Sequence, residues 1–419
     1  MNKKKTDESN LLSSRCTIPS DWLIKQLGDC TVIKGEYGIN AAAVDYSMEL
    51  PTYLRITDID EEGNFISLEK KSVNDKKSKN YILKNGDIVF ARTGATVGKT
   101  YLHNDKNKEL VFAGFLIRYR TDEKQLLPYY LKSYTETKPY WDWVKIVSMR
   151  SGQPGINATE YCELKIPLPP LVEQIAIAAL LSTWDKAIST AQLMLNLKKN
   201  QKKWLSQMLL TGEKRLKGFK GEWKTFKIKE TFERVTRKNN EGNNNVVTIS
   251  AQRGFVKQDD FFTKIVASDI LDNYFLVEKG EFCYNKSYSN GYPWGATKRL
   301  KDFDKAVVTT LYICFRIKNE NDYSADFFEH FFEAGSLDKG LTKIAHEGGR
   351  AHGLLNVTPS DFFNLNITIP HYKEQSAIAT VLSLAGEELI LLRKKLYLLK
   401  EQKKGLMQIL LTGKKKITP

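Results

Sequence analysis

The chain has 419 residues, enough for two or more domains, and 42% of them are hydrophobic, so it can bury sizeable cores. Lysine and arginine outnumber aspartate and glutamate by 64 to 49, and the formal charge of +15 favours a polyanionic partner such as nucleic acid. The five scattered cysteines form no CxxC pair, which argues against a zinc site and indicates reduced thiols. No run reaches the length of a spanning helix, and "MNKKKTDESNLLSSR" lacks a signal-peptide core, so we expect a cytoplasmic protein without a membrane partner.

Residues 1–17 are predicted to form a flexible N-terminal tail, and residues 18–170 a first mixed α/β domain. This region contains short apolar runs bounded by Gly, Asn and Asp, which is typical of strands and short helices. The run "GDIVFAR" (86–92) predicts a strand, and "PYYLKSYTET" (128–137) predicts a helix.

The stretch "TGATVGKT" (93–100) follows the predicted strand and looks like a phosphate-binding loop. A P-loop has four residues between its first glycine and the Gly-Lys pair, but only three separate Gly94 from Gly98. The residues after Thr100 are polar and show no helical period, so no helix N-terminus is predicted to face a phosphate. We therefore expect a different role for this loop.

Residues 171–212 predict a long helix that follows Pro169-Pro170 and ends at Thr211-Gly212. About 40 residues at 1.5 Å per residue give a helix of roughly 60 Å. Apolar residues along it follow a 4-3 spacing, which is the pattern of a coiled-coil seam. This seam includes Ile177, Leu181 and Ile188.

Residues 213–370 predict a second mixed α/β domain. Strands are expected at "NNVVTISA" (244–251), "GEFCYNK" (280–286) and "AVVTTLYICFRI" (306–317), and a helix at "ADFFEHFFEA" (325–334).

Residues 371–413 predict a second long helix, and a basic C-terminal tail follows at 414–419. Segments 173–214 and 374–415 align without a gap, and 20 of the 42 positions are identical, which chance does not produce. The second helix carries the same 4-3 seam, at positions that include Ile378, Leu382 and Leu389.

The regions that precede the two helices match more loosely, with Trp22 and Trp223 at the same offset of 201 residues. The predicted fold is therefore α+β, with an internal pseudo-twofold repeat. Two mixed α/β domains are separated by two long helices that pair as an antiparallel coiled coil. The alternative is that each helix packs only on its own domain.

Both domains contain loops that mix basic, amide and hydroxyl side chains with glycine. The loop "ARTGATVGKT" (91–100) corresponds to "NKSYSNGYPWGATKR" (285–299), and "SMRSGQPGIN" (148–157) corresponds to "HEGGRAHGLLN" (346–356). A third loop, "ISAQRGFVKQDD" (249–260), is clear only in the second domain.

Such side chains suit DNA, because Arg and Lys can bond guanine edges, Gln and Asn adenine edges, and Ser and Thr phosphates. The alternative is a set of solvated loops with ordinary turn glycines. The candidate DNA-contacting residues are Arg92, Thr93, Lys99, Arg150, Gln153, Gln252, Arg253, Lys286, Tyr288, Asn290, Arg350 and His352.

Motifs of catalysis are missing from the sequence. We find no glycine-rich AdoMet loop after a strand, no Asn/Asp-Pro-Pro-aromatic motif of adenine methyltransferases, and no paired carboxylate-lysine nuclease site. No catalytic residue and no metal ligand is therefore predicted.

The segment "IPLPPLVEQIAIAALLSTWDKAI", its second copy, and "SGQPGIN" before the first copy resemble the specificity (S) subunit of Type I restriction-modification enzymes, the HsdS family. The resemblance covers essentially the whole chain from about Ile18 onward. The second copy departs from the family pattern, because "IPHYKEQ" lacks the double proline and "GGRAHGLLN" replaces a Gly-x-x-Gly form.

The resemblance implies a non-catalytic DNA-binding subunit of a bacterial host-defence complex. Each domain would be a target recognition domain for one half of a bipartite, asymmetric DNA target, and the paired helices would set the gap. Two methyltransferase (M) subunits with AdoMet would dock on the helices and methylate adenine, and restriction (R) subunits would use ATP and Mg²⁺. The chain itself would need no cofactor. The residues expected in the coiled coil or the docking surface are Glu173, Gln174, Ile177, Leu181, Ile188, Glu374, Gln375, Ile378, Leu382 and Leu389.

Two other classes stay open on the residues alone. A DNA-modifying enzyme would need the motifs that are missing here. A scaffold whose basic domains bind other proteins would fail to capture DNA fragments in a sequence-specific way.

Overall fold

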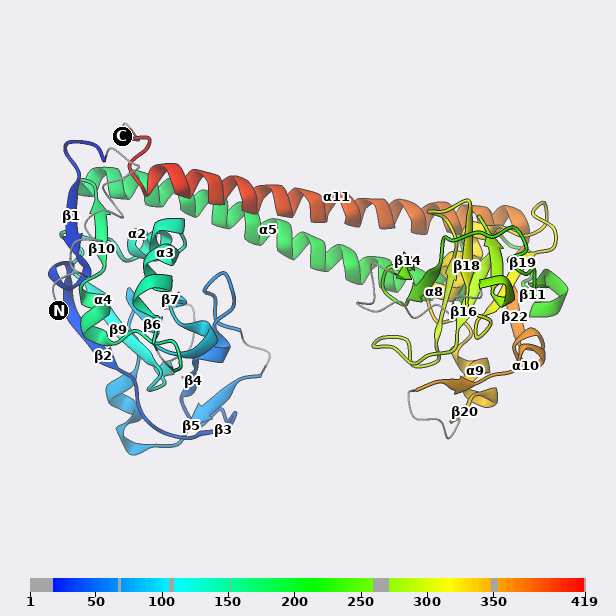
Figure 1. The fold of residues 1–419 in the computed structure, drawn as a ribbon, viewed down its shortest axis with the longest axis horizontal. Coiled ribbons are helices and arrows are strands. Elements are labelled where there is room, and N and C mark those ends of the chain that lie inside the picture. The colour runs from blue at the N-terminus through cyan, green and yellow to red at the C-terminus, as the bar shows by residue number, and fades with distance from the viewer. Residues whose placement is uncertain are drawn as a thin grey trace. The chain divides into compact units, whose positions relative to one another are not determined.

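The computed structural model describes residues 18–66, 69–104, 109–150, 152–258, 271–347 and 353–417. The chain divides into two compact units: Met1–Gln192 with Lys394–Pro419 form unit 1, and Leu193–Arg393 form unit 2. Two long helices, α5 (Leu171–Leu210) and α11 (Tyr372–Leu410), each contribute one half to each unit (Figure 1).

Unit 1 is built on two four-stranded sheets and a strand pair. The first sheet has the order β2 (Thr31–Tyr37), β9 (Leu116–Thr121), β6 (Asp87–Ala91), β7 (Thr100–Leu102). The second has the order β3 (Ala43–Asp45), β5 (Lys71–Val73), β4 (Thr52–Leu54), β8 (Leu110–Phe112). β1 (Leu23–Gln26) pairs antiparallel with β10 (Lys165–Leu168). The helices are α2 (Pro128–Tyr134), α3 (Lys138–Val147) and α4 (Ala158–Cys162).

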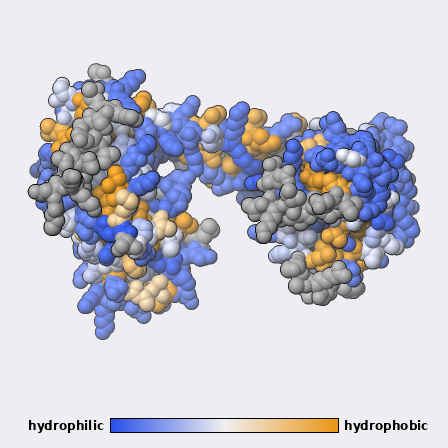
Figure 2. Space-filling model, in the orientation of Figure 1, coloured by the Kyte–Doolittle hydropathy of each residue, from blue (hydrophilic) through white to orange (hydrophobic). Residues whose placement is uncertain are grey.

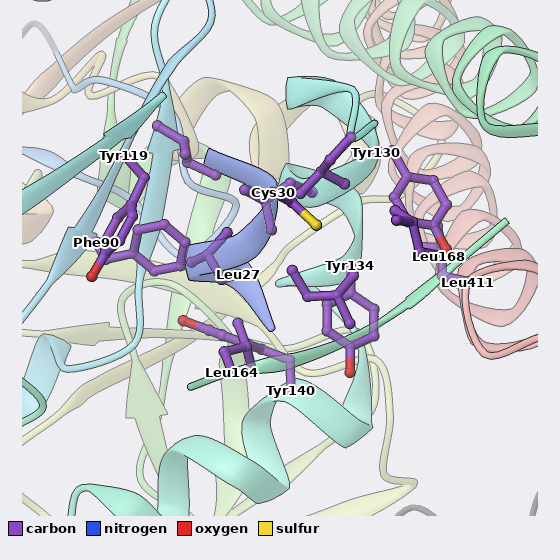
Figure 3. Packing of buried hydrophobic residues seen from close by; sticks show 14 of the residues in the cluster. Leu27, Cys30, Phe90, Tyr119, Tyr130, Tyr134, Tyr140, Leu164, Leu168 and Leu411 are labelled. Atoms are coloured by element: carbon purple, nitrogen blue, oxygen red, sulfur yellow. The ribbon is translucent and has the colours of Figure 1, made fainter. Parts of the chain in front are cut away.

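The core of unit 1 lies between the first sheet, these helices and the long helices. All five residues of β6 are buried, and the four that follow Asp87 are apolar, which explains the apolar run in the sequence. Tyrosines fill much of this core, and Figure 3 shows Tyr130 and Leu168 beside Leu411, which lies just after α11. The C-terminal end of α11 is therefore part of the core of the first domain.

Unit 2 repeats the central architecture of unit 1. Its four-stranded sheet has the order β12 (Phe232–Val235), β19 (Ile313–Ile317), β16 (Phe282–Asn285), β17 (Ala296–Arg299). Its strand pair is β11 (Lys224–Lys227) with β22 (Asn366–Ile369), matching β1 with β10 in unit 1. The internal repeat predicted from the sequence is thus confirmed at the level of strand order.

The two units differ in what surrounds this shared framework. Where unit 1 has a second four-stranded sheet, the described part of unit 2 has three further strand pairs: β13 (Val247–Ser250) with β14 (Gly254–Lys257), β15 (Phe275–Glu278) with β18 (Lys305–Val308), and β20 (His346–Glu347) with β21 (Leu355–Asn356). Its helices besides the long pair include α6 (Ile228–Thr231), α8 (Ala325–Glu333), α9 (Asp338–Ile344) and α10 (Pro359–Phe363). The core is rich in phenylalanine.

One predicted strand is wrong in its extent. The run 306–317 was expected as a single strand, but it forms the end of β18 and all of β19, separated by a turn in which Tyr312 N donates to Thr309 O (3.2 Å). The break occurs because β18 pairs with β15 whereas β19 pairs with β12 and β16, so the two strands belong to different sheets. The helices expected at 128–137 and 325–334 form as α2 and α8.

The long helices pack along the predicted seam. Of the six seam residues named above, Ile177, Leu181, Ile378, Leu382 and Leu389 are buried and Ile188 is half-buried. In unit 1 Lys403 of α11 bonds Asp185 of α5 (2.7 Å), and in unit 2 Lys198 of α5 bonds Glu388 of α11 (2.8 Å). Within each unit the late part of one helix therefore lies beside the early part of the other, which is antiparallel pairing.

One expectation about membranes needs correction. An 18-residue window of α11 has a mean hydropathy of 1.4, so this helix could cross a membrane by length and composition alone. That is weak evidence, because the core helix of a soluble protein passes the same test. Only 28% of that window is buried, so α11 leaves apolar side chains exposed, and Figure 2 shows apolar atoms at the surface of the helical stretch.

Candidate nucleic-acid interface

The two predicted loops of unit 1 lie together. Thr93 forms an antiparallel bridge with Gly155, and Gly94 N donates to Pro154 O (3.1 Å). Ile156 N donates to the carbonyl of Arg92 (2.9 Å). Two loops that are far apart in the sequence therefore form one surface of unit 1, which the sequence alone did not indicate.

The structure also explains why the loop at 93–100 is not a P-loop. Gly94–Thr96 form a single 3-10 turn, and strand β7 follows it instead of a helix. A Cβ atom on Gly98 would lie 2.7 Å from Val144 Cγ1, so this glycine allows α3 to pack closely against the loop. Its role is internal packing and not an approach to a phosphate.

Arg92 is held at its backbone from both sides. Its N–H donates to the carbonyl of Phe115 (3.0 Å), and its own carbonyl accepts from Ile156. Its guanidinium lies over the ring of Tyr37, 4.8 Å from the centroid. Phe115 is 58% exposed, and Tyr37 is partly exposed at the end of β2.

The other candidates of unit 1 differ in their freedom to bind a ligand. Lys99 is only 14% exposed and bonds Glu61 (2.7 Å), whose side chain is largely in solvent. Arg150 bonds Glu160 (2.5 Å) and two carbonyls of its own turn. Either cation would have to exchange a carboxylate for a phosphate. Gln153 is exposed beside Gly94.

Three loops of unit 2 also converge. Gln252 Nε2 donates to the carbonyl of Asn290 (3.0 Å), which joins the loop after β13 to the loop after β16. Tyr288 N donates to Gly353 O (2.9 Å), which joins the latter loop to the segment before β21. Tyr288 is 63% exposed, and Arg253 is exposed beside Gln252.

The structure makes Lys286 a weaker candidate for DNA contact than the sequence indicated. Its Nζ points to the carbonyl of Val357 (3.4 Å), and burial lowers its pKa. The carbonyl of Lys286 accepts from Leu355 N (2.9 Å), so the residue links two loops internally. Arg350 and His352 lie outside the described residues.

Sequence reasoning missed Tyr37 and Phe115. Each borders a glycine, in "YGIN" and "AGFL", and lies at the end or start of a strand, which is a weak indication of a turn. Nothing local shows that the Tyr37 ring or the Phe115 carbonyl contacts Arg92, because the three residues come from different strands and loops.

The Glu-Gln doublet at the start of each long helix is buried within its own unit. In unit 1 Glu173 accepts from Trp22 Nε1 (3.0 Å) and from Ile417 N (3.2 Å). Gln174 accepts from Leu127 N (3.0 Å) and donates to Gln125 O (2.8 Å) and Pro169 O (3.0 Å). These side chains bind the start of the helix to its own domain.

The second doublet, Glu374-Gln375, binds the start of α11 to unit 2 in the same way, except that the partner of the glutamate differs. Gln375 accepts from Ser324 N (2.9 Å) and donates to Pro370 O (2.9 Å). Glu374 is bonded by the guanidinium of Arg215 through two nitrogens (both 2.5 Å), which raises the pKa of Arg215. Trp223 Nε1 is buried with no partner among the described residues, unlike Trp22.

The described residues of the basic tail predicted at 414–419 contact the first domain. Lys416 bonds Asp21 (2.5 Å), and this ion pair lowers the pKa of Asp21. Together with the bond from Ile417 N to Glu173, it ties the tail to the beginning of the first domain.

Comparison with known proteins agrees with this architecture. Residues 19–199 match the model of the Type I restriction modification DNA specificity domain. The MjaVIII type I restriction enzyme specificity subunit of Methanocaldococcus jannaschii is 24% identical over 95% of this chain and 93% of its own length. A second specificity subunit of that organism, MjaX, is 26% identical over 95% of this chain and 94% of its own length.

Solved structures share the fold. The HsdS subunit of Thermoanaerobacter tengcongensis superposes with a TM-score of 0.50 at 16% identity, over 96% of this chain and 99% of that one. The Type I S subunit of M. genitalium superposes with a TM-score of 0.55 at 13% identity, over 93% and 96%. The shared fold is one of mixed α/β domains combined with two long helices. Over nearly its whole length, the chain is therefore similar to the specificity subunits of Type I restriction enzymes.

Proposed function

We propose that this chain selects the DNA target of a Type I restriction-modification complex, and that each unit recognises one half of a bipartite, asymmetric duplex site. The observation that carries the proposal is the contrast between the units. They share the order of the central sheet and the buried helix entry, yet present different loops. One framework with two different polar surfaces suits two different half-sites.

The long helices would set the unread gap between the half-sites. Each is continuous over 40 and 39 residues, and each is buried along a heptad seam. A paired seam resists bending, so the helices suit a spacer.

The same helices offer an apolar surface to methyltransferase subunits. Aliphatic and aromatic side chains project from them into solvent, and exposed apolar patches of this kind mark protein interfaces. In unit 2 they are Leu193, Met194, Leu197, Trp204, Leu384, Ile390 and Leu391, and in unit 1 they include Val172, Ile175 and Tyr397. Two M subunits with AdoMet would bind there, and R subunits with ATP and Mg²⁺ would join that core. The chain itself would contribute specificity and no chemistry, in the bacterial cytoplasm.

Methylome sequencing tests the function directly. A host without DNA methylation would express the chain with its M subunit, and M alone as the control. We expect N6-methyladenine in both halves of one split motif, and only when this chain is present. Absence of new methylation, with M folded and bound to AdoMet, would refute the proposal and favour a scaffold.

A further inference from the structure

Arg92 differs from the other described arginines of unit 1. Four of the five bond a carboxylate: Arg55 bonds Asp58, Arg118 bonds Glu36, Arg120 bonds Asp87 and Arg150 bonds Glu160. Among the described residues Arg92 has no carboxylate partner, although it lies in the loop surface of the candidate interface. Among the described arginines of unit 1, Arg92 is therefore the one whose charge is not paired with a carboxylate.

The guanidinium of Arg92 is nevertheless held in place. It lies over Tyr37, and the Tyr37 hydroxyl accepts a hydrogen bond from Ala158 N at the start of α4 (3.1 Å). The backbone of Arg92 is bonded on both sides, to Phe115 and Ile156. A ring stacked against a guanidinium restrains its plane but leaves its N–H groups at the edge free to donate.

We propose that Arg92 recognises a guanine in the half-site of unit 1, and that Tyr37 is the positioning residue that orients its guanidinium. This inference rests on the proposed function. Guanine presents two acceptors, O6 and N7, in the major groove, and an arginine fork bonds both at once. A fork whose plane is already set loses less entropy on binding.

The competing explanation is that Arg92 contacts a phosphate, and the substitution Arg92→Lys distinguishes this from guanine recognition. Lysine keeps the positive charge for a phosphate but cannot make the bidentate contact to guanine. Arg92→Lys should therefore preserve methylation while relaxing one motif position. If Arg92 contacts a phosphate, Arg92→Lys should leave every position of the motif unchanged and alter the affinity for all DNA sequences equally.

The experiment is methylome sequencing of the complex formed by the full chain and its M subunit. Wild type should require G at one position of one half-site. In Arg92→Lys and in Tyr37→Leu, preference for G there should fall about tenfold, equivalent to ~1.4 kcal/mol, while the other half-site stays unchanged. Tyr37→Phe keeps the ring and should restore the preference to within about threefold of wild type. Co-purification with M and the melting temperature show that each variant is folded.

The matched control is Tyr46→Leu. Tyr46 is another partly exposed ring of unit 1 with a cation over it, Lys70 at 5.7 Å, but it has no contact with Arg92. Loss of the Tyr46 ring should leave the methylated motif unchanged. An unaltered motif in Arg92→Lys would overturn the guanine assignment and leave the proposed function intact. A wild-type chain that directs no methylation would overturn both.

Discussion

At the scale of single residues, the most constrained polar groups lie at the entry to each long helix and not in the loops. Gln174 is completely buried and its amide satisfies Leu127 N, Gln125 O and Pro169 O. The amide thus joins the start of α5 to the segment before α2. A buried group that loses its partner costs about 1–3 kcal/mol, so one substitution here affects several groups at once.

Gln174→Leu is expected to lower the free energy of unfolding of unit 1 by at least about 2 kcal/mol, because three backbone groups lose their partner. Chemical denaturation of the full chain measures this. Gln402→Leu, an exposed glutamine of α11, is the control and should change stability by less than about 0.5 kcal/mol. Equal stability of the two variants would contradict the structural role of the doublet.

Repetition in the sequence pointed to Glu173-Gln174 and Glu374-Gln375, but it did not reveal which groups these side chains contact. Identity between two copies shows that a residue is needed, and it does not show whether the side chain faces inward or outward. The partners of Glu173 are Trp22 and Ile417, which lie 151 and 244 residues away. No local pattern can reveal contacts of that separation.

At the scale of elements, α8 meets α11 in unit 2 through His330, whose Nε2 lies 2.9 Å from Ser383 Oγ. Burial, reinforced by the charge of Lys202, lowers the pKa of His330 below its ordinary value of about 6.5. The folded state therefore favours the neutral ring, and the unfolded state binds the proton more readily. Stability from this group is present above about pH 6.5 and is lost as the pH falls toward the folded pKa.

The expected result is that the melting temperature of unit 2 falls between pH 7.5 and pH 5.5 by more in wild type than in His330→Gln. Other titrating groups are common to both proteins, so the difference isolates this ring. Scanning calorimetry across that range is the measurement. Parallel pH profiles of the two proteins would show that His330 does not couple to folding.

The apolar surface of the long helices carries a prediction about assembly. Ile390 and Leu391 are 63% and 66% exposed, so Ile390→Asp with Leu391→Asp should leave the fold intact but weaken binding of the M subunit at least tenfold. Co-purification and titration calorimetry measure this. Leu311→Asp, at a leucine that is 55% exposed and lies outside the long helices, should bind M normally. Undiminished binding by the double variant would place the docking surface elsewhere.

Elements with a strong period were predictable, and turns between sheets were not. The 4-3 spacing places Leu382 and Leu389 in a buried seam whatever surrounds it, because the helical repeat itself fixes the face. The run 306–317 is interrupted between the strands only by Thr309 and Thr310, and threonine is itself common in strands, so nothing local shows that β18 and β19 join different sheets. The stacking of Arg92 on Tyr37 was equally hidden, since it depends on how β2 and the loop after β6 meet.

At the scale of the whole molecule, the chain interleaves its two units. The end of α11 and the tail complete the first domain through Leu411, Lys416 and Ile417, while α5 ends inside the core of unit 2 at Leu210. On this division unit 1 consists of two separate pieces of sequence, and unit 2 is the continuous piece between them. A change in length of one helix alone must therefore disturb the seam, whereas matched changes in both can preserve it.

This gives the sharpest test of the helices as a spacer. Duplicating residues 186–192 in α5 and 387–393 in α11 adds one heptad to each helix at the boundary between the units. A heptad keeps the 4-3 seam, since each duplicated segment carries two of its residues. Seven residues add about 10 Å, which is about 3 base pairs at 3.4 Å each.

The methylome of the double insertion should show both half-sites unchanged and the gap about three base pairs longer. Either duplication alone makes one helix seven residues longer than its partner, so the seam residues of the two helices no longer match. Each single duplication should therefore lower stability and abolish split-motif methylation. These single insertions are the controls for a change in length without a preserved seam. A double insertion with the original gap would mean that something other than helix length sets the spacing, and altered half-sites would mean that the helices take part in base recognition.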